Sequence, residues 1–167
     1  MKNILLLAAT FLIFISTINF AQKEVPANQV VPLTIKVLAL NKSLKGNIKI
    51  FVIGNDAIAN ELKKNIGNTI VAATISDVDA GNDIPSGKYE IVYVCNPSKV
   101  NAAKNYAKQN KSLTITNIPT LAFEGVTLGF GLDDDKKQII FLNLSSSSEQ
   151  GMEWNPAIMK VAQTIKN

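Results

Sequence analysis

Residues 89–116 read YEIVYVCNPSKVNAAKNYAKQNKSLTIT and contain the pattern that decides the fold. The first seven are mostly β-branched or aromatic, which predicts a strand buried on both faces, as at the centre of a parallel sheet. Pro97 then favours the first turn of a helix that runs to about residue 110, with Val100 and Ala103 on its inner face. Residues 113–116 form the next strand. A strand, a crossover helix and another strand predict a parallel βαβ unit.

The same alternation extends in both directions from this unit. Upstream, the hydrophobic spacing predicts two helices, two strands and a surface loop: helix 30–44 with Pro32 near its start, strand 47–53, helix 56–65, strand 69–76 and loop 77–87. Downstream, it predicts a hairpin and a last amphipathic helix: strands 126–131 and 138–144 joined by turn 132–137, then helix 155–166. We therefore expect an α/β fold in a single three-layer domain, with a mostly parallel sheet flanked by helices and a late antiparallel hairpin.

The N-terminal segment has the three parts of a secretory signal. Lys2 is followed by an apolar run, and the small residue Ala21 stands before Gln22. The apolar run is shorter than the roughly 20 residues that a membrane span needs. We predict a signal peptide over residues 1–21, cleaved near Ala21–Gln22. The remaining domain, residues 22–167, is then periplasmic with no stable membrane insertion; the alternative is an uncleaved N-terminal anchor.

The composition excludes several classes of function. The net charge of +4 comes from lysine alone, since the chain has no arginine, and this disfavours nucleic-acid binding. The absence of histidine excludes Ser-His-Asp and Cys-His catalysis and histidine-containing zinc sites. The single cysteine, Cys95, cannot form an internal disulfide or a thiolate metal site. We expect Cys95 to be a buried thiol at a strand end, with a redox role or a dimer bridge as alternatives.

The remaining motifs do not indicate catalysis. Asp77, Asp79 and Asp83 alternate in a glycine-containing stretch that could hold calcium, but the spacing fails the EF-hand pattern and a solvated acidic loop is the simpler interpretation. Gly129 and Gly131 flank a phenylalanine inside a predicted strand, not between a strand and a helix, so they are not a dinucleotide-binding motif. We therefore predict no catalytic residue, no metal and no cofactor, and a protein that works by binding.

Three segments follow one another in the second half of the chain: SLTITN at 112–117, FEGVTLGF at 123–130 and QIIFLNL at 138–144. In sequence and order these segments resemble the YfiR family of periplasmic proteins. Upstream, the family's opening helix and two strands are matched by residues 31–38, 48–54 and 89–95. The chain departs from the pattern at Val126, where many members have a second glycine. It also departs at residues 42–44, which replace a Trp-Pro pair, and it lacks the paired C-terminal cysteines of some members.

This resemblance implies an exported regulatory protein and not an enzyme. The family's better-known members are dimeric inhibitors that bind the periplasmic sensory domain of a membrane diguanylate cyclase and thereby lower cyclic di-GMP and biofilm formation. We therefore expect the partner to be a membrane signalling protein, a diguanylate cyclase or a sensor kinase, and we expect a homodimer. The candidate partner-binding residues are Phe123, Glu124, Phe130 and Trp154, because aromatic residues are favoured interface anchors. Core packing is the alternative role for each.

Two other functions remain open on the sequence. The chain could be a periplasmic small-molecule-binding or enzyme-like domain that uses a pocket at the sheet edge through Asp77, Asp79 and Glu124. Carboxylates that converge in a pocket and have raised pKa values would favour this interpretation. The chain could also be a structural component of an envelope complex.

Overall fold

The computed structural model describes residues 23–166, so the expected signal peptide and its cleavage site at Ala21–Gln22 lie outside the described residues. The elements, in chain order, are α1 (Ala27–Leu38), β1 (Gly46–Ile53), α2 (Asp56–Lys63), β2 (Thr69–Ile70), β3 (Ala73–Gly81), β4 (Ile91–Val94), the 3-10 turn η1 (Pro97–Lys99), α3 (Val100–Asn110), β5 (Leu113–Thr116), α4 (Thr120–Phe123), β6 (Leu128–Leu132), β7 (Gln138–Asn143), α5 (Leu144–Glu149), α6 (Ile158–Val161) and β8 (Gln163–Ile165). Within residues 23–166, no helix is long and apolar enough to cross a bilayer.

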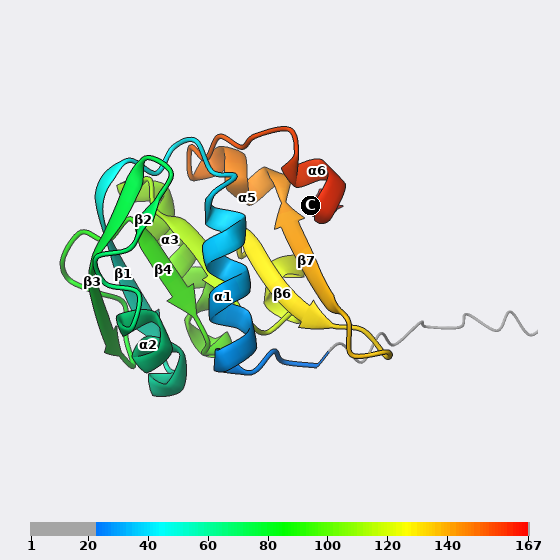
Figure 1. The fold of residues 1–167 in the computed structure, drawn as a ribbon. Helices are drawn as coiled ribbons and strands as arrows, with labels where there is room; N and C mark the ends of the chain where they lie inside the picture. The colour runs from blue at the N-terminus through cyan, green and yellow to red at the C-terminus, as the bar shows by residue number, and fades with distance from the viewer. Residues whose placement is uncertain (1–22, 167) are drawn as a thin grey trace, which may run out of the picture.

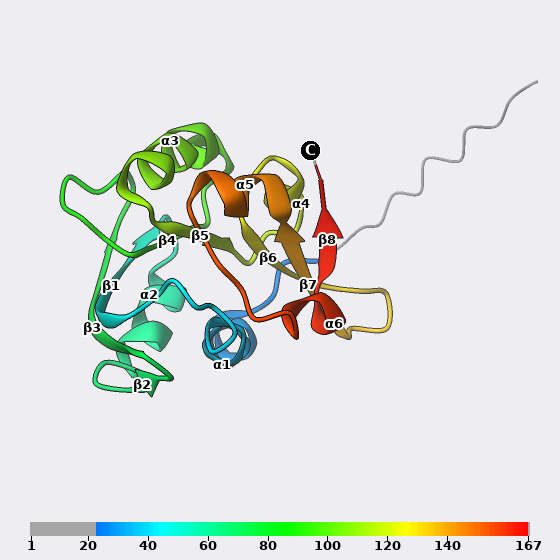
Figure 2. The same ribbon diagram turned by 90° about the horizontal axis from the view of Figure 1, so that it is seen from above.

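The strands form one eight-stranded sheet in the order β2-β3-β1-β4-β5-β6-β7-β8 (Figure 1). Neighbouring strands are parallel except at β2–β3 and at β6–β7. Helices α1, α2 and α6 cover one face, and α3, α4 and α5 cover the other (Figure 2). The predicted three-layer α/β fold, with its mostly parallel sheet and late antiparallel hairpin, is confirmed.

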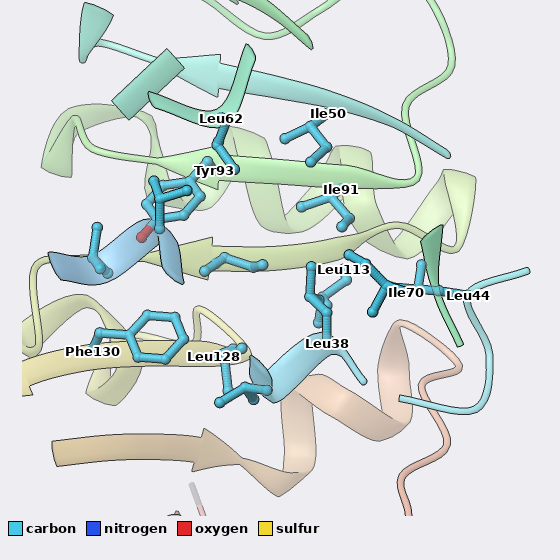
Figure 3. Packing of buried hydrophobic residues seen from close by; sticks show 14 of the residues in the cluster. Leu38, Leu44, Ile50, Leu62, Ile70, Ile91, Tyr93, Leu113, Leu128 and Phe130 are labelled. Carbon is cyan, nitrogen blue, oxygen red and sulfur yellow. The ribbon is translucent and has the colours of Figure 1, made fainter. Parts of the chain in front are cut away.

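Alternation along the central strands divides the core between the two faces. In β4, Ile91 and Tyr93 belong to the large cluster under α1 and α2 (Figure 3). Val92 and Val94, between and beyond them, belong to the smaller cluster under α3. All four residues are completely buried, because a central parallel strand covered by helices on both faces has no solvent-facing side.

The first helix begins three residues earlier and ends six residues earlier than the sequence predicted. It begins after Pro26, whose carbonyl oxygen accepts from the N–H of Val30. It ends at Leu38, beyond which the Asn41 side chain accepts from the backbone N–H of Ser43 and Leu44. Those two hydrogen bonds fix a turn that competes with continued helix. The expected helix over residues 30–44 is therefore wrong at both boundaries.

The stretch predicted as one strand and a loop is a hairpin. Val71, with φ of +54°, lies in the turn between β2 and β3. β3 then continues through Asp77, Val78 and Asp79, pairing in parallel with β1 as far as Gly81. Val78 is buried and the two aspartates on either side of it are not, so this acidic stretch has the alternation of a strand with one buried face. The expected loop over residues 77–87 is wrong for its first five positions.

The C-terminal segment also differs from the prediction. Instead of a helix over residues 155–166, it has the one-turn helix α6 followed by β8, which pairs in parallel with β7. Ile165 in β8 is buried against Phe141 and Ala122, and this burial favours the extended conformation. The segment before β6 contains the short helix α4, and the serine run at 145–148 lies in α5.

Candidate functional site

Two of the four candidate partner-binding residues lie together. Phe123 is the last residue of α4, and Glu124 follows it directly. Phe123 is 50% exposed, and Glu124 is exposed as well. We call these two residues, together with the half-buried Ile139 of β7, the α4 patch. The patch lies on the face of the sheet that α3, α4 and α5 cover (Figure 2).

The sequence fixes α4 closely against β6. A Cβ atom on Gly129 would lie 2.7 Å from the Cβ of Ala122, and one on Gly131 would lie 3.0 Å from the Cβ of Pro119. The first distance is shorter than real side-chain contacts, and the second is tight enough that Pro119 would have to shift, so close packing of α4 and the residue before it on β6 explains the Gly-Phe-Gly motif. The Asn143 amide, which is completely buried, donates to the carbonyl oxygen of Ala122 at 2.9 Å. The α4 patch is therefore carried on a rigid support.

Aromatic packing and a lysine surround the patch. The Phe123 ring lies 5.3 Å from the Phe141 ring at an angle of 56°, within the range of favourable aromatic pairs. Lys104 of α3 donates from Nζ to the carbonyl oxygen of Glu124 at 2.9 Å. Within residues 23–166, the Glu124 carboxylate forms no salt bridge. The patch thus presents an aromatic ring beside a negative charge.

The other two candidates lie elsewhere. Phe130 in β6 is completely buried in the large core under α1, because its side chain points to the face opposite α4 (Figure 3). It therefore packs as a core residue and offers no surface to a partner. Trp154 lies between α5 and α6, half-buried against the same core, and its indole Nε1 donates to the Ser147 hydroxyl at 2.8 Å. Only Phe123 and Glu124 of the four remain together at the surface.

The carboxylates of the small-molecule alternative do not converge. Asp77 and Asp79 lie in β3, whereas Glu124 follows α4, and β1, β4 and β5 separate β3 from β6 in the sheet. Asp79 accepts a hydrogen bond of 2.6 Å from the Tyr89 hydroxyl. This hydrogen bond, with a smaller contribution from burial, raises the pKa of Tyr89 to about 12. The interaction is structural, since it fastens the segment before β4 to β3.

The third aspartate of the acidic stretch, Asp83, has partners of its own. Asp83 forms a salt bridge of 3.1 Å with Lys99, and it accepts from the backbone N–H of Ile84. The hydrogen bond from Ile84, followed by Lys99, lowers the pKa of the Asp83 carboxyl. Among residues 23–166, no group of three or more His, Cys, Asp or Glu side chains is placed to hold a metal ion.

Cys95 lies directly after β4 and packs against the large core. Burial, together with the charge of Glu24, raises the pKa of its thiol. Cys95 is half-buried and not completely buried as expected, although it lies at a strand end and packs on the core as expected. A reactive cysteine needs the opposite environment, exposed and electropositive.

This environment predicts slow alkylation of Cys95 by iodoacetamide. In the urea-unfolded chain, the thiol should titrate near its ordinary pKa of about 8.5. In the folded protein, the raised pKa keeps the thiol protonated at that pH, so labelling at pH 8.5 should be at least about tenfold slower, as measured by mass spectrometry. Equal rates in the folded and unfolded protein would show that packing does not protect the thiol and would reopen a redox role.

Comparisons with known proteins give a family match and a solved structure of similar fold. A family model described as YfiR/HmsC-like matches residues 39–163, from the end of α1 to the start of β8. The chain belongs to the YfiR/HmsC-like family. Among solved structures, it is similar to a conserved domain protein from Vibrio cholerae O1 biovar El Tor str. N16961. That match has a TM-score of 0.54 and 14% identity, covering 85% of this chain and 60% of the other.

The Vibrio cholerae structure shows the fold alone, because the identity is low and this chain spans only 60% of its length. A search of curated proteins finds no match. The YfiR/HmsC-like match covers β1 to β7 and therefore includes α4, Phe123 and Glu124. The resemblance that the sequence motifs indicated is thus confirmed at the level of the family.

Proposed function

We propose that this YfiR/HmsC-like protein is an exported regulator that binds the periplasmic sensory domain of a membrane signalling protein, a diguanylate cyclase or a sensor kinase. Binding holds down the output of that protein, and with a cyclase as the partner it lowers cyclic di-GMP and biofilm formation. The observation that carries the proposal is the family match over residues 39–163. The regulator acts in the periplasm, after removal of the N-terminal segment.

The α4 patch is the surface that we assign to this contact. A half-exposed phenylalanine on a rigid helix provides an apolar anchor without a large ordering cost, and such anchors concentrate binding energy. Glu124 beside it provides a charge that selects a partner with a basic group at the matching place. A homodimer would need a second, self-complementary surface, so that both contacts can form together.

The proposal is tested by affinity capture from detergent-solubilised membranes of the protein's own host, using the exported chain as bait. We expect recovery of a multi-pass protein with a periplasmic sensory domain and a cytoplasmic cyclase or kinase domain. Phe123→Ser should weaken its binding by about tenfold or more, since a truncated hot-spot aromatic costs roughly 2 kcal/mol. Glu124→Lys should weaken binding as well, because it reverses the charge of the patch.

Ile66→Ser is the matched control. Ile66 is 47% exposed, close to the value for Phe123, but it follows α2 on the opposite face of the sheet. This variant should bind normally. Equal losses in the Ile66 and Phe123 variants would remove the α4 patch from the proposal, and recovery of no signalling protein with the unmodified bait would overturn the function itself.

A further inference from the structure

Three lysines lie at one end of the sheet, each just before a central strand. Lys45 precedes β1, Lys88 precedes β4 and Lys111 precedes β5, and these three strands are neighbours in the sheet. Because the strands are parallel, their amino ends meet at the same edge, so the lysines converge although more than 60 positions separate the first from the last. A cavity of about 370 Å³ opens between them, with Leu44 and Met152 on its walls.

Figure 3 shows Leu44 at the end of the core where Ile91 and Leu113 begin their strands. The cavity therefore lies at the amino end of the sheet, and the α4 patch lies elsewhere. Its volume is in the range of pockets that take small molecules, about 300–1,000 Å³. The large core lies below it and gives it a fixed floor.

The cavity carries an excess of positive charge. Among residues 23–166, the ammonium groups of Lys45, Lys88 and Lys111 form no salt bridge, while four other lysines do. The lining includes one carboxylate, that of Glu90, and this group accepts from the backbone N–H of Lys49 at 2.8 Å. Three unpaired cations around one tethered carboxylate form a site of net positive potential.

Two carbonyl groups in the last turns of α3 have partners within the chain. The oxygen of Ala107 accepts from the N–H groups of Lys111 and Ser112. The Asn110 amide donates to the oxygen of Tyr106 at 2.9 Å. Lysine side chains often bind carbonyl groups at helix C-termini, and these two carbonyl groups are satisfied without a lysine side chain.

Lys111 occupies a position that normally favours glycine. Its φ is +55° and its ψ is +44°, the left-handed conformation that follows many helices. A Cβ atom on Gly151 would lie 3.3 Å from Cδ of Lys111, so the lysine stem crosses that glycine closely. The side chain is thus held by the backbone and by packing across the wall of the cavity.

We propose that this cavity binds a small molecule carrying two negatively charged oxygen groups, either a phosphate ester or a dicarboxylate. Lys45, Lys88 and Lys111 supply the charge, and the free oxygen of the Asn110 amide accepts from a hydroxyl or amine on the ligand. The site is independent of the partner contact proposed above, since it uses none of the same residues.

The test is a titration of the ¹⁵N-labelled exported protein with inorganic phosphate and, separately, with succinate, followed by NMR. We expect saturable shifts of the amides of Leu44, Lys45 and Gly151 with at least one probe. Lys45→Gln, Lys88→Gln and Lys111→Gln should each weaken binding by roughly threefold to fivefold, the size of one partly exposed ion pair. Saturation by phosphate alone assigns a phosphorylated ligand, and saturation by succinate alone assigns a dicarboxylate.

Two further variants make the outcome decisive. Lys64→Gln removes the lysine directly after α2 that pairs with Glu61, and it should leave binding unchanged. Lys111→Gly removes the ammonium group while relieving the left-handed backbone, so it should raise the melting temperature and still weaken binding. No saturable shift at about 10 mM of either probe, ten times the Kd of a millimolar site, would overturn the proposal. An equal loss in Lys64→Gln would overturn it too.

Discussion

Replacing Phe130 by alanine should lower the free energy of unfolding by about 3–5 kcal/mol, one of the largest effects available in this chain. The ring is completely buried in the large core between β6 and α1. The substitution loses the free energy gained by moving the ring from water into the core. It also leaves a cavity that the close-packed neighbours fill only in part. Urea unfolding followed by circular dichroism measures the change as a shift in midpoint with an unchanged slope.

Phe123→Ala is the matched control, because it makes the same chemical change on a ring that is half exposed. It should cost only about 1 kcal/mol, most of it from the contact with Phe141. Should Phe130→Ala prevent folding altogether, Phe130→Leu keeps most of the volume and should cost about 1–2 kcal/mol. Equal losses in the two alanine variants would contradict the placement of Phe130 in the core.

Variants of Phe130 and Phe123 also distinguish a loss of stability from a loss of partner binding. If Phe130→Ala weakens capture of a signalling protein, the loss follows from unfolding and should scale with the measured free energy. If Phe123→Ser weakens capture of the signalling protein, the fraction of folded protein should be unchanged. The sequence offered both residues as partner-binding candidates. In the structure they lie on opposite faces of the sheet, because Phe130 of β6 points towards α1 and Phe123 belongs to α4 on the other face.

The central part of the fold was predictable because β4 and β5 are buried along their whole length, as is most of the second half of β1. The apolar runs of β1, β4 and β5 admit few other interpretations, and Asn55 caps α2 as its position indicates. Two strands away from the centre of the sheet, β3 and β8, were harder to predict. β3 carries Asp77 and Asp79 on its less buried side, so its strand alternation was mistaken for a loop. β8 has only three residues, and its pairing depends on contacts with β7 that no local pattern specifies.

The grouping of charged residues in space was also only partly predictable from the sequence. Phe123 and Glu124 are adjacent in sequence, so a local interpretation could place them together. Lys45, Lys88 and Lys111 each precede a predicted strand, but nothing in their own segments connects them. They become one group only when β1, β4 and β5 are known to be parallel neighbours. Strand order is a property of the whole chain, and that is why the cavity could not be predicted.

A buried polar network depends on Gln150 in the same way. Its side-chain oxygen accepts from the backbone N–H of Thr114 at 3.0 Å and from the Thr127 hydroxyl at 2.7 Å. Its amide donates to the Thr114 hydroxyl at 2.9 Å, and that hydroxyl accepts from the N–H of Thr127. All three residues are at most 2% exposed, so water cannot replace these hydrogen bonds. The network connects the end of α5 to β5 and to the residue before β6.

Gln150→Leu should therefore lower the free energy of unfolding by about 3–5 kcal/mol, because it leaves a backbone N–H and a hydroxyl buried without partners, each costing about 1–3 kcal/mol. Gln109→Leu makes the same change on the exposed surface of α3 and should stay within about 0.5 kcal/mol of the unmodified protein. Urea unfolding compares the two variants directly. A loss below about 1 kcal/mol in Gln150→Leu would mean that the site rearranges to pair these groups, and a buried network would then be the wrong account of how α5 is joined to the sheet.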